Sequence, residues 1–96
     1  MIKHIVLFQF KNGKKNSTDL ELIKKSLEDL VNFIPELKSI EVGINSNPKE
    51  MFDLALTTEF ESWEDLNSYV VHPEHQKVST LIRATLDQRA CVDYEF

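Results

Sequence analysis

Residues 3–10 read KHIVLFQF, and their alternation with a period of two is typical of a β-strand. One face of this strand is apolar except for a histidine: His4, Val6, Phe8 and Phe10. The other face is apolar except for a glutamine: Ile5, Leu7 and Gln9. Both faces should therefore be covered, yet a chain of 96 residues has enough helix for only one of them. The strand thus predicts that a partner covers its second face.

After a polar loop over residues 11–16, a long helix is expected. Ser17, Thr18 or Asp19 can cap its start, and it should run to Ile34, because the residue before Pro35 is driven toward extended geometry. Its apolar side chains recur at steps of three and four: Leu20, Ile23, Leu27, Leu30, Val31 and Ile34. Three further segments alternate as strands do: residues 38–44, 52–60 and 89–95.

Two short helices are expected between the last two strands. A helix-start box, SWED at residues 62–65, opens the first, with an apolar stripe of Trp63, Leu66, Tyr69 and Val70. The pair His72-Pro73 ends it, and Pro73 suits the first position of the next helix. That helix should bury Val78, Leu81, Ile82 and Leu86. The order β-α-β-β-α-α-β predicts one α+β domain over residues 1–96, a ferredoxin-like split βαβ fold with helices on one face of a four-stranded antiparallel sheet.

Composition narrows the class of protein. The chain is 42% hydrophobic and 28% charged, which is typical of a globular protein, and it has no apolar run of the ~20 residues that a membrane span needs. Its net charge is −5, with no concentrated basic stripe, so nucleic acid is not an expected partner. The single Cys91 rules out an internal disulfide and suits a reducing cytoplasm.

Four segments together resemble the stress-responsive dimeric α/β-barrel (Dabb) family: KHIVLF at 3–8, IPEL at 34–37, YVVHPEHQ at 69–76 and VDY at 92–94. The resemblance covers the chain in order and spacing, and Tyr-x-x-His-Pro-x-His is its most specific element. It implies that two ferredoxin-like subunits pair their sheets into one barrel, as a homodimer. The apolar face with Ile5, Leu7, Ala90 and Val92 should form that interface. The family includes a plant enzyme that closes a linear polyketide without a cofactor.

Two residues are the candidates for catalysis. His75 can act as a general base if a pocket holds a carbonyl compound within reach, and Tyr69 can steady a developing oxyanion. Each also has a structural interpretation, His75 as a surface histidine in a first helical turn and Tyr69 as a core tyrosine. The resemblance implies functional roles for both, because the residues at the matching positions of the plant enzyme are functional.

A pocket between the sheet and the helices should surround these two residues. His4 would form part of its floor, although a histidine on this face is also compatible with a hydrogen-bonded core residue. The other expected lining residues are apolar: Val6, Phe8, Ile23, Leu27, Leu56 and Leu66. Leu27 and Leu54 stand where the plant enzyme has a tyrosine and a histidine, so a different ligand, or none, is expected.

No cofactor is expected. The glycines do not form a phosphate-binding loop, and the three histidines lack a zinc-ligand spacing. His72 should cap the helix that follows it, and Cys91 should serve packing. The resemblance allows one structural cation on the main-chain carbonyls of Val31, Ile34 and Leu37.

Three functions stay open. The chain is a cofactor-independent enzyme of the lyase or cyclase kind acting on a carbonyl compound, a module that binds a small apolar ligand, or a structural, stress-related dimer. The fold cannot decide between them.

Overall fold

A computed structural model of the 96-residue chain describes residues 1–11 and 17–96. The polar loop expected at 11–16 lies outside the described residues apart from Lys11, and so does capping by the side chains of Ser17 and Thr18.

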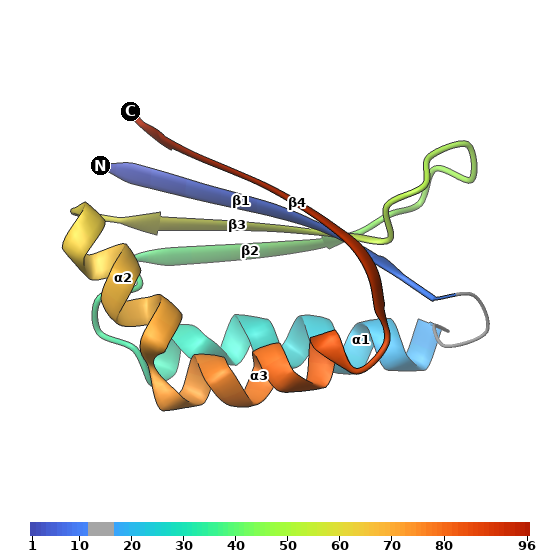
Figure 1. Ribbon diagram of the computed structural model, residues 1–96, viewed down its shortest axis with the longest axis horizontal. Helices are drawn as coiled ribbons and strands as arrows, with labels where there is room; N and C mark the ends of the chain where they lie inside the picture. Colours follow the sequence, from blue (N-terminus) through green and yellow to red (C-terminus); the bar gives the residue numbers. More distant parts are fainter. Residues whose placement is uncertain (12–16) are drawn as a thin grey trace.

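The secondary structure follows the expected order (Figure 1). The elements are β1 (Ile2–Phe10), α1 (Ser17–Glu28), a 3₁₀ helix η1 (Asp29–Asn32), β2 (Ser39–Ile44), β3 (Leu54–Phe60), α2 (Trp63–Val71), α3 (Pro73–Arg83) and β4 (Leu86–Glu95). The strands form one antiparallel sheet in the order β2-β3-β1-β4. The helices lie on one side of it, and the two termini lie together (Figure 1). The predicted ferredoxin-like α+β fold is confirmed.

Three element boundaries differ by more than one residue from those expected. The first helix leaves α geometry after Glu28 and tightens into η1, whose end is closed by the N–H groups of Phe33 and Ile34 on the carbonyl of Leu30. Strand β3 begins at Leu54 and not at residue 52, and β4 begins at Leu86, three residues before the expected start. The late start of β3 has a local cause at Asp53.

Asp53 turns inward just before β3. Its N–H donates to the carbonyl of Phe8 at 2.8 Å, and its Oδ2 accepts the N–H of Phe10, also at 2.8 Å. The side chain therefore replaces a main-chain acceptor at the end of β1, and Asp53 is buried although it is charged.

The core lies between the sheet and the helices, with alternate residues of β1 and β3 fully buried. Four residues expected there are exposed instead: Val31 is 41% exposed, Trp63 49%, Val70 39% and Leu81 52%. Val31 leaves the apolar stripe because η1 has about 3.0 residues per turn and not about 3.6. Trp63 is the first residue of α2, and Leu81 borders an open hollow of about 230 Å³ between α1 and α3.

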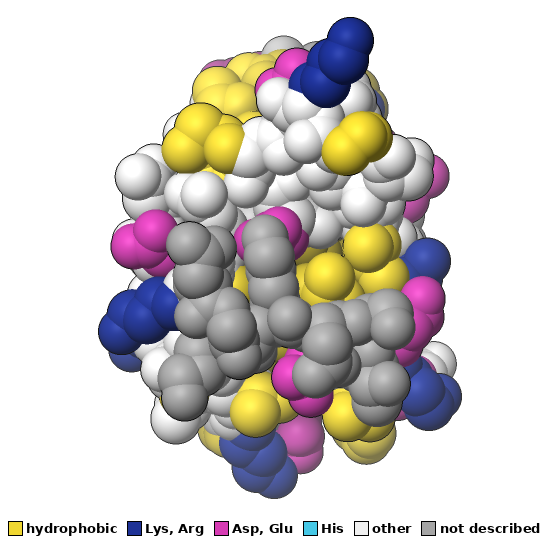
Figure 2. Space-filling model, turned by 90° about the vertical axis from the view of Figure 1, so that its right-hand side faces the viewer, with side chains coloured by type: hydrophobic (Ala, Val, Ile, Leu, Met, Phe, Trp, Pro, Cys, Tyr) yellow, Lys and Arg dark blue, Asp and Glu magenta, His cyan; other side chains and the backbone are white. Residues whose placement is uncertain are grey.

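Figure 2 shows the side of the molecule that is on the right in Figure 1. Positively and negatively charged side chains are mixed on this face. The described Lys and Arg side chains stand apart there, among acidic and hydrophobic ones. A continuous basic stripe, as phosphate backbones require, is not seen among the described residues on this face. Every described helix is too short or too polar to cross a bilayer.

Phe60 should be an anchor of this core. It is fully buried, and its ring packs on Tyr69 with the centroids 5.1 Å apart. Phe60→Ala should lower the free energy of unfolding by about 3–5 kcal/mol, because it leaves a cavity. Phe33→Ala is the matched control, since Phe33 is 56% exposed, and should change stability by about 0.5 kcal/mol or less. Urea denaturation measures both, and equal losses would contradict this description of the core.

Candidate functional site

The site is organised by the break between α2 and α3. His72 caps α3, with its Nδ1 accepting the N–H of Glu74 at 3.1 Å, as the sequence predicted. In a continuous helix that N–H would bond to the carbonyl of Val70. Pro73 has no N–H and starts α3 in a new direction. The carbonyl of Val70 is therefore open to other donors.

His75 uses this carbonyl. Its Nδ1 lies 2.9 Å from the oxygen of Val70, and Nε2 of Gln76 donates to the same oxygen at 2.7 Å. Because a carbonyl only accepts, Nδ1 of His75 must hold a proton. In the neutral ring the other nitrogen, Nε2, then has the free lone pair. Burial lowers the pKa of His75 below 6.5, and the Val70 hydrogen bond opposes this only in part. The ring is thus held neutral in one tautomer, which suits a general base.

Tyr69 lies directly beneath His75. The two ring centroids are 4.4 Å apart, and the ring of His4 is 6.3 Å away on another side. Tyr69 is completely buried, and its hydroxyl has no hydrogen-bond partner among the described residues. Burial raises its pKa, so the phenol stays protonated and can only act as a neutral donor or acceptor. An unsatisfied buried hydroxyl costs about 1–3 kcal/mol, which a ligand or water could recover.

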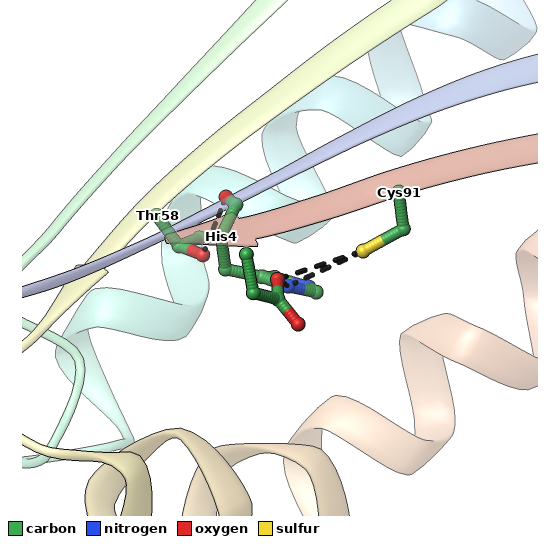
Figure 3. A network of polar contacts seen from close by, with 4 residues as sticks. His4, Thr58 and Cys91 are labelled. Carbon is green, nitrogen blue, oxygen red and sulfur yellow. Dashed lines mark hydrogen bonds and ion pairs between the residues drawn. The ribbon is translucent and has the colours of Figure 1, made fainter. Parts of the chain in front are cut away.

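His4 enters the site from β1. Its Nδ1 pairs with the carboxylate of Asp93 on β4, and the sulfur of Cys91 lies 3.6 Å from the same nitrogen (Figure 3). Its main-chain carbonyl accepts the hydroxyl of Thr58 at 3.1 Å. Partial burial, and then the Asp93 carboxylate, raise the pKa of the Cys91 thiol, while Arg89 acts in the opposite direction. Cys91 is exposed, so the expectation that it serves packing is wrong.

A cavity of about 290 Å³ opens beside these residues, between the sheet, α1, α3 and the start of β4. Among the expected site residues, four line it: His4, Phe8, Leu27 and His75. Tyr69 is behind its wall, against His75. The other expected lining residues are buried in the core: Val6, Ile23, Leu56 and Leu66. Of these, Ile23 borders the hollow between α1 and α3 instead.

Sequence reasoning missed the polar part of this wall. Arg83, Arg89 and Ser79 line the cavity, and Arg83 is held by two hydrogen bonds to the hydroxyl of Ser79, at 2.7 and 3.2 Å. The signal was present, because Ser79 and Arg83 are four residues apart and share one helix face. The position of Arg89 beside the cavity could be predicted only from the register of β4 on β1, which puts it opposite Phe8.

The cation site expected at the end of the first helix stays a prediction. The carbonyl of Ile34 accepts the N–H of Leu37 at 3.1 Å, which leaves one lone pair on that oxygen. Val31 is exposed there, so an ion would be open to water.

The family model "Stress responsive A/B Barrel Domain" matches residues 2–96. The chain is 31% identical to the stress-response A/B barrel domain-containing protein HS1 of Arabidopsis thaliana, over 98% of this chain and 88% of that protein. It is 27% identical to olivetolic acid cyclase of Cannabis sativa, over 97% and 94% of the two chains.

Among solved structures, a protein of Bacteroides fragilis, described as dimeric and ferredoxin-like, superposes with a TM-score of 0.88 at 37% identity. The match covers 99% of this chain and 95% of that one. The family match over nearly the whole sequence and this structural likeness agree with the fold found above. The chain belongs to the Dabb family of stress-responsive A/B barrel domains.

Proposed function

We propose that the chain is a homodimeric enzyme that removes a proton from the carbon next to a carbonyl group, without a cofactor. The observation that carries this proposal is the pairing of His75 with Tyr69. One ring is a neutral base with a defined free nitrogen, and the other offers a buried hydroxyl that the described residues leave unsatisfied.

The two residues would divide the chemistry. Nε2 of His75 accepts the proton from the carbon, and the electron pair of the broken C–H bond moves onto the carbonyl oxygen as an enolate. The Tyr69 hydroxyl would donate to that oxygen and stabilise charge that develops in the transition state, once a turn of the His75 ring uncovers it, because Tyr69 now lies behind the cavity wall. The raised pKa of Tyr69 keeps this donor protonated. The enolate can then attack a second carbonyl, as in a cyclisation, or expel a leaving group.

The cavity favours a small ligand with an apolar body and one anionic end. Its volume of about 290 Å³ is near the lower end of the roughly 300–1,000 Å³ of small-molecule sites. Phe8, Leu27 and Ile82 supply apolar wall, and Arg83 and Arg89 supply positive charge. An oxo-carboxylate fits this distribution.

A related enzyme supports this chemistry. The name of the Cannabis sativa relative, olivetolic acid cyclase, describes a ring-forming reaction. The second candidate is a module that binds a small ligand without changing it. Leu27 favours that alternative, because it lies in the cavity wall at a position where the chain departs from the pattern of the cyclase.

The dimer is proposed from the bare face of the sheet. All the described helices lie on the other side (Figure 1). Ile5 is opposite Val92 and Leu7 is opposite Ala90 in the β1–β4 ladder, so the four side chains share the uncovered face. Val92 is 53% exposed in the isolated chain. The Bacteroides fragilis protein is described as dimeric, which supports the same assembly here.

Leu7→Glu should split or unfold the dimer, because an unpaired buried charge is costly. Light scattering should report about 22 kDa for the wild-type chain of 11.2 kDa at micromolar concentration, and half of that, or an unfolded species, for the variant. Glu21→Ala, at an exposed position of α1 on the other side of the sheet, is the control and should leave the mass unchanged. A wild-type mass of 11.2 kDa would end the dimer proposal.

Deuterium exchange tests the chemistry without knowledge of the product. A series of 4-oxocarboxylates of increasing chain length in D₂O should exchange their α-protons faster with the protein than with buffer, as NMR can measure. His75→Ala should lower this rate by about 10²–10⁴-fold, and Tyr69→Phe should lower it less. His72→Asn is the matched control, because it removes an imidazole and keeps a helix cap. If the probes bind to all variants and none is exchanged, the chain is a binding module.

The lowered pKa of His75 predicts a pH dependence. The unfolded chain binds more protons at His75 than the folded chain does, between the unfolded value of 6.5 and the lower folded pKa. The free energy of unfolding should therefore fall as the pH is lowered through this window, and His75→Gln should flatten that part of the curve. In an NMR titration, the His75 ring should have its midpoint below 6.5. A midpoint at or above 6.5 would remove the reason for a neutral base.

A further inference from the structure

Three side chains of different chemistry meet on the helix-facing side of β1 and β4. In the β1–β4 ladder, Asp93 is opposite His4, and Cys91 is opposite Val6. Because Cys91 and Asp93 are two residues apart, they point to the same side of β4. The ring of His4 reaches both of them (Figure 3). One imidazole nitrogen, one thiol sulfur and one carboxylate oxygen thus lie within 4.8 Å of one another.

The spacing of these atoms matches a tetrahedral metal site. Sγ of Cys91 is 3.6 Å from Nδ1 of His4 and 3.6 Å from Oδ1 of Asp93. For Zn–S near 2.3 Å and Zn–N or Zn–O near 2.0–2.1 Å, a tetrahedron has edges of about 3.5 Å between sulfur and either of the other ligands. Only the third edge, between Nδ1 of His4 and Oδ1 of Asp93, must lengthen, because these two atoms now bond directly to each other. An ion between them would take the place of the shared proton.

We propose that His4, Cys91 and Asp93 bind one zinc-like divalent ion. The set of one sulfur, one nitrogen and one oxygen ligand suits a borderline-soft metal and does not suit Mg²⁺ or Ca²⁺, which prefer oxygen ligands. Three protein ligands leave one position for water or a ligand, as in catalytic zinc sites. His4 also lines the cavity that contains His75, so the open position borders the same space. The sequence hid this site, because its ligands are 87 and 89 residues apart and are joined only by the strand register.

The surroundings hold one of the ligands in place and leave another adjustable. His4 is only 7% exposed, and its main chain is fixed by the ladder and by the hydroxyl of Thr58. The side chain of Asp93 is about one-third exposed on an edge strand, so it can rotate to open the third edge and to admit the ion. Arg89 lies close to Cys91 and repels a cation. It is the group that should weaken this site most.

Cobalt is the probe, because Co²⁺ occupies zinc sites and reports thiolate ligation by colour. Untagged, metal-stripped wild-type protein should bind one Co²⁺ per chain and show a thiolate-to-cobalt charge-transfer band together with intense tetrahedral ligand-field bands. Zn²⁺ should displace the cobalt and raise the thermal midpoint of unfolding. Cys91→Ser should abolish the charge-transfer band and weaken Zn²⁺ binding by at least about 10-fold, which is the least that loss of even an outer-shell partner usually costs.

Paired variants separate this site from general metal binding. Asp93→Asn should weaken Zn²⁺ binding, while Glu95→Gln, two residues along the same face of β4, should not. Arg89→Gln should strengthen Zn²⁺ binding and weaken the binding of an oxo-carboxylate, so the metal site and the proposed reaction can fail separately. The proposal is overturned if one equivalent of Co²⁺ gives no charge-transfer band, or if folded Cys91→Ser binds Zn²⁺ as tightly as the wild type.

Discussion

The pairing of β1 with neighbours on both edges is the constraint on which the rest of the structure depends. β1 bonds to β3 along one edge and to β4 along the other, so the first and last strands of the chain lie side by side. Its alternation sends one set of side chains under the helices and the other set to the bare face. A slip of one residue would exchange the two sets, and with them His4 and Ile5. The apolar pattern of β1 therefore decides both where the candidate site lies and which face the proposed partner would cover.

The second determinant is the break at His72 and Pro73. A continuous helix would use the carbonyl of Val70 internally and would give His75 no fixed hydrogen bond. The break frees that oxygen. His75 donates a hydrogen bond to it from Nδ1, and this bond fixes the tautomer of the ring. The cap by His72 satisfies the N–H of Glu74 at the start of the new helix. A local rule of helix ends thus sets which nitrogen of a histidine can take a proton.

The sequence predicted the fold well, because each element has a strong local signal. The alternation of β1, the capping box at Ser62 and the proline at 73 are all found where their patterns place them. The site was predicted less completely. Of the expected site residues, His4 and His75 line the cavity, but Val6 and Leu66 belong to the core, since a side chain that faces the helices need not reach an empty space. Cavities depend on how side chains fill volume between elements, and periodicity does not contain that information.

The same limit explains why the cluster at Cys91 was missed. Alternation showed that Cys91 and Asp93 share a face of a strand, but not which residues of β1 they oppose. Register depends on hydrogen bonds between segments almost ninety residues apart, and it brings both next to His4. His4 therefore has two roles in one position, as part of the cavity wall and as the meeting point of a carboxylate and a thiol.

The hydroxyl of Tyr69, which has no hydrogen-bond partner among the described residues, supports the proposal that this arrangement serves more than stability. A phenylalanine would fill the same space between His75 and Phe60 without leaving a buried polar atom unpaired. A domain of 96 residues has a folding free energy of only about 5–15 kcal/mol, so a loss of about 1–3 kcal/mol is a large fraction of it. The hydroxyl is also next to His75, whose pKa is lowered by burial. Under the proposed enolate chemistry, a donor without a partner among the described residues and a base without a proton on Nε2 would both have a use, which a purely structural dimer would not give them.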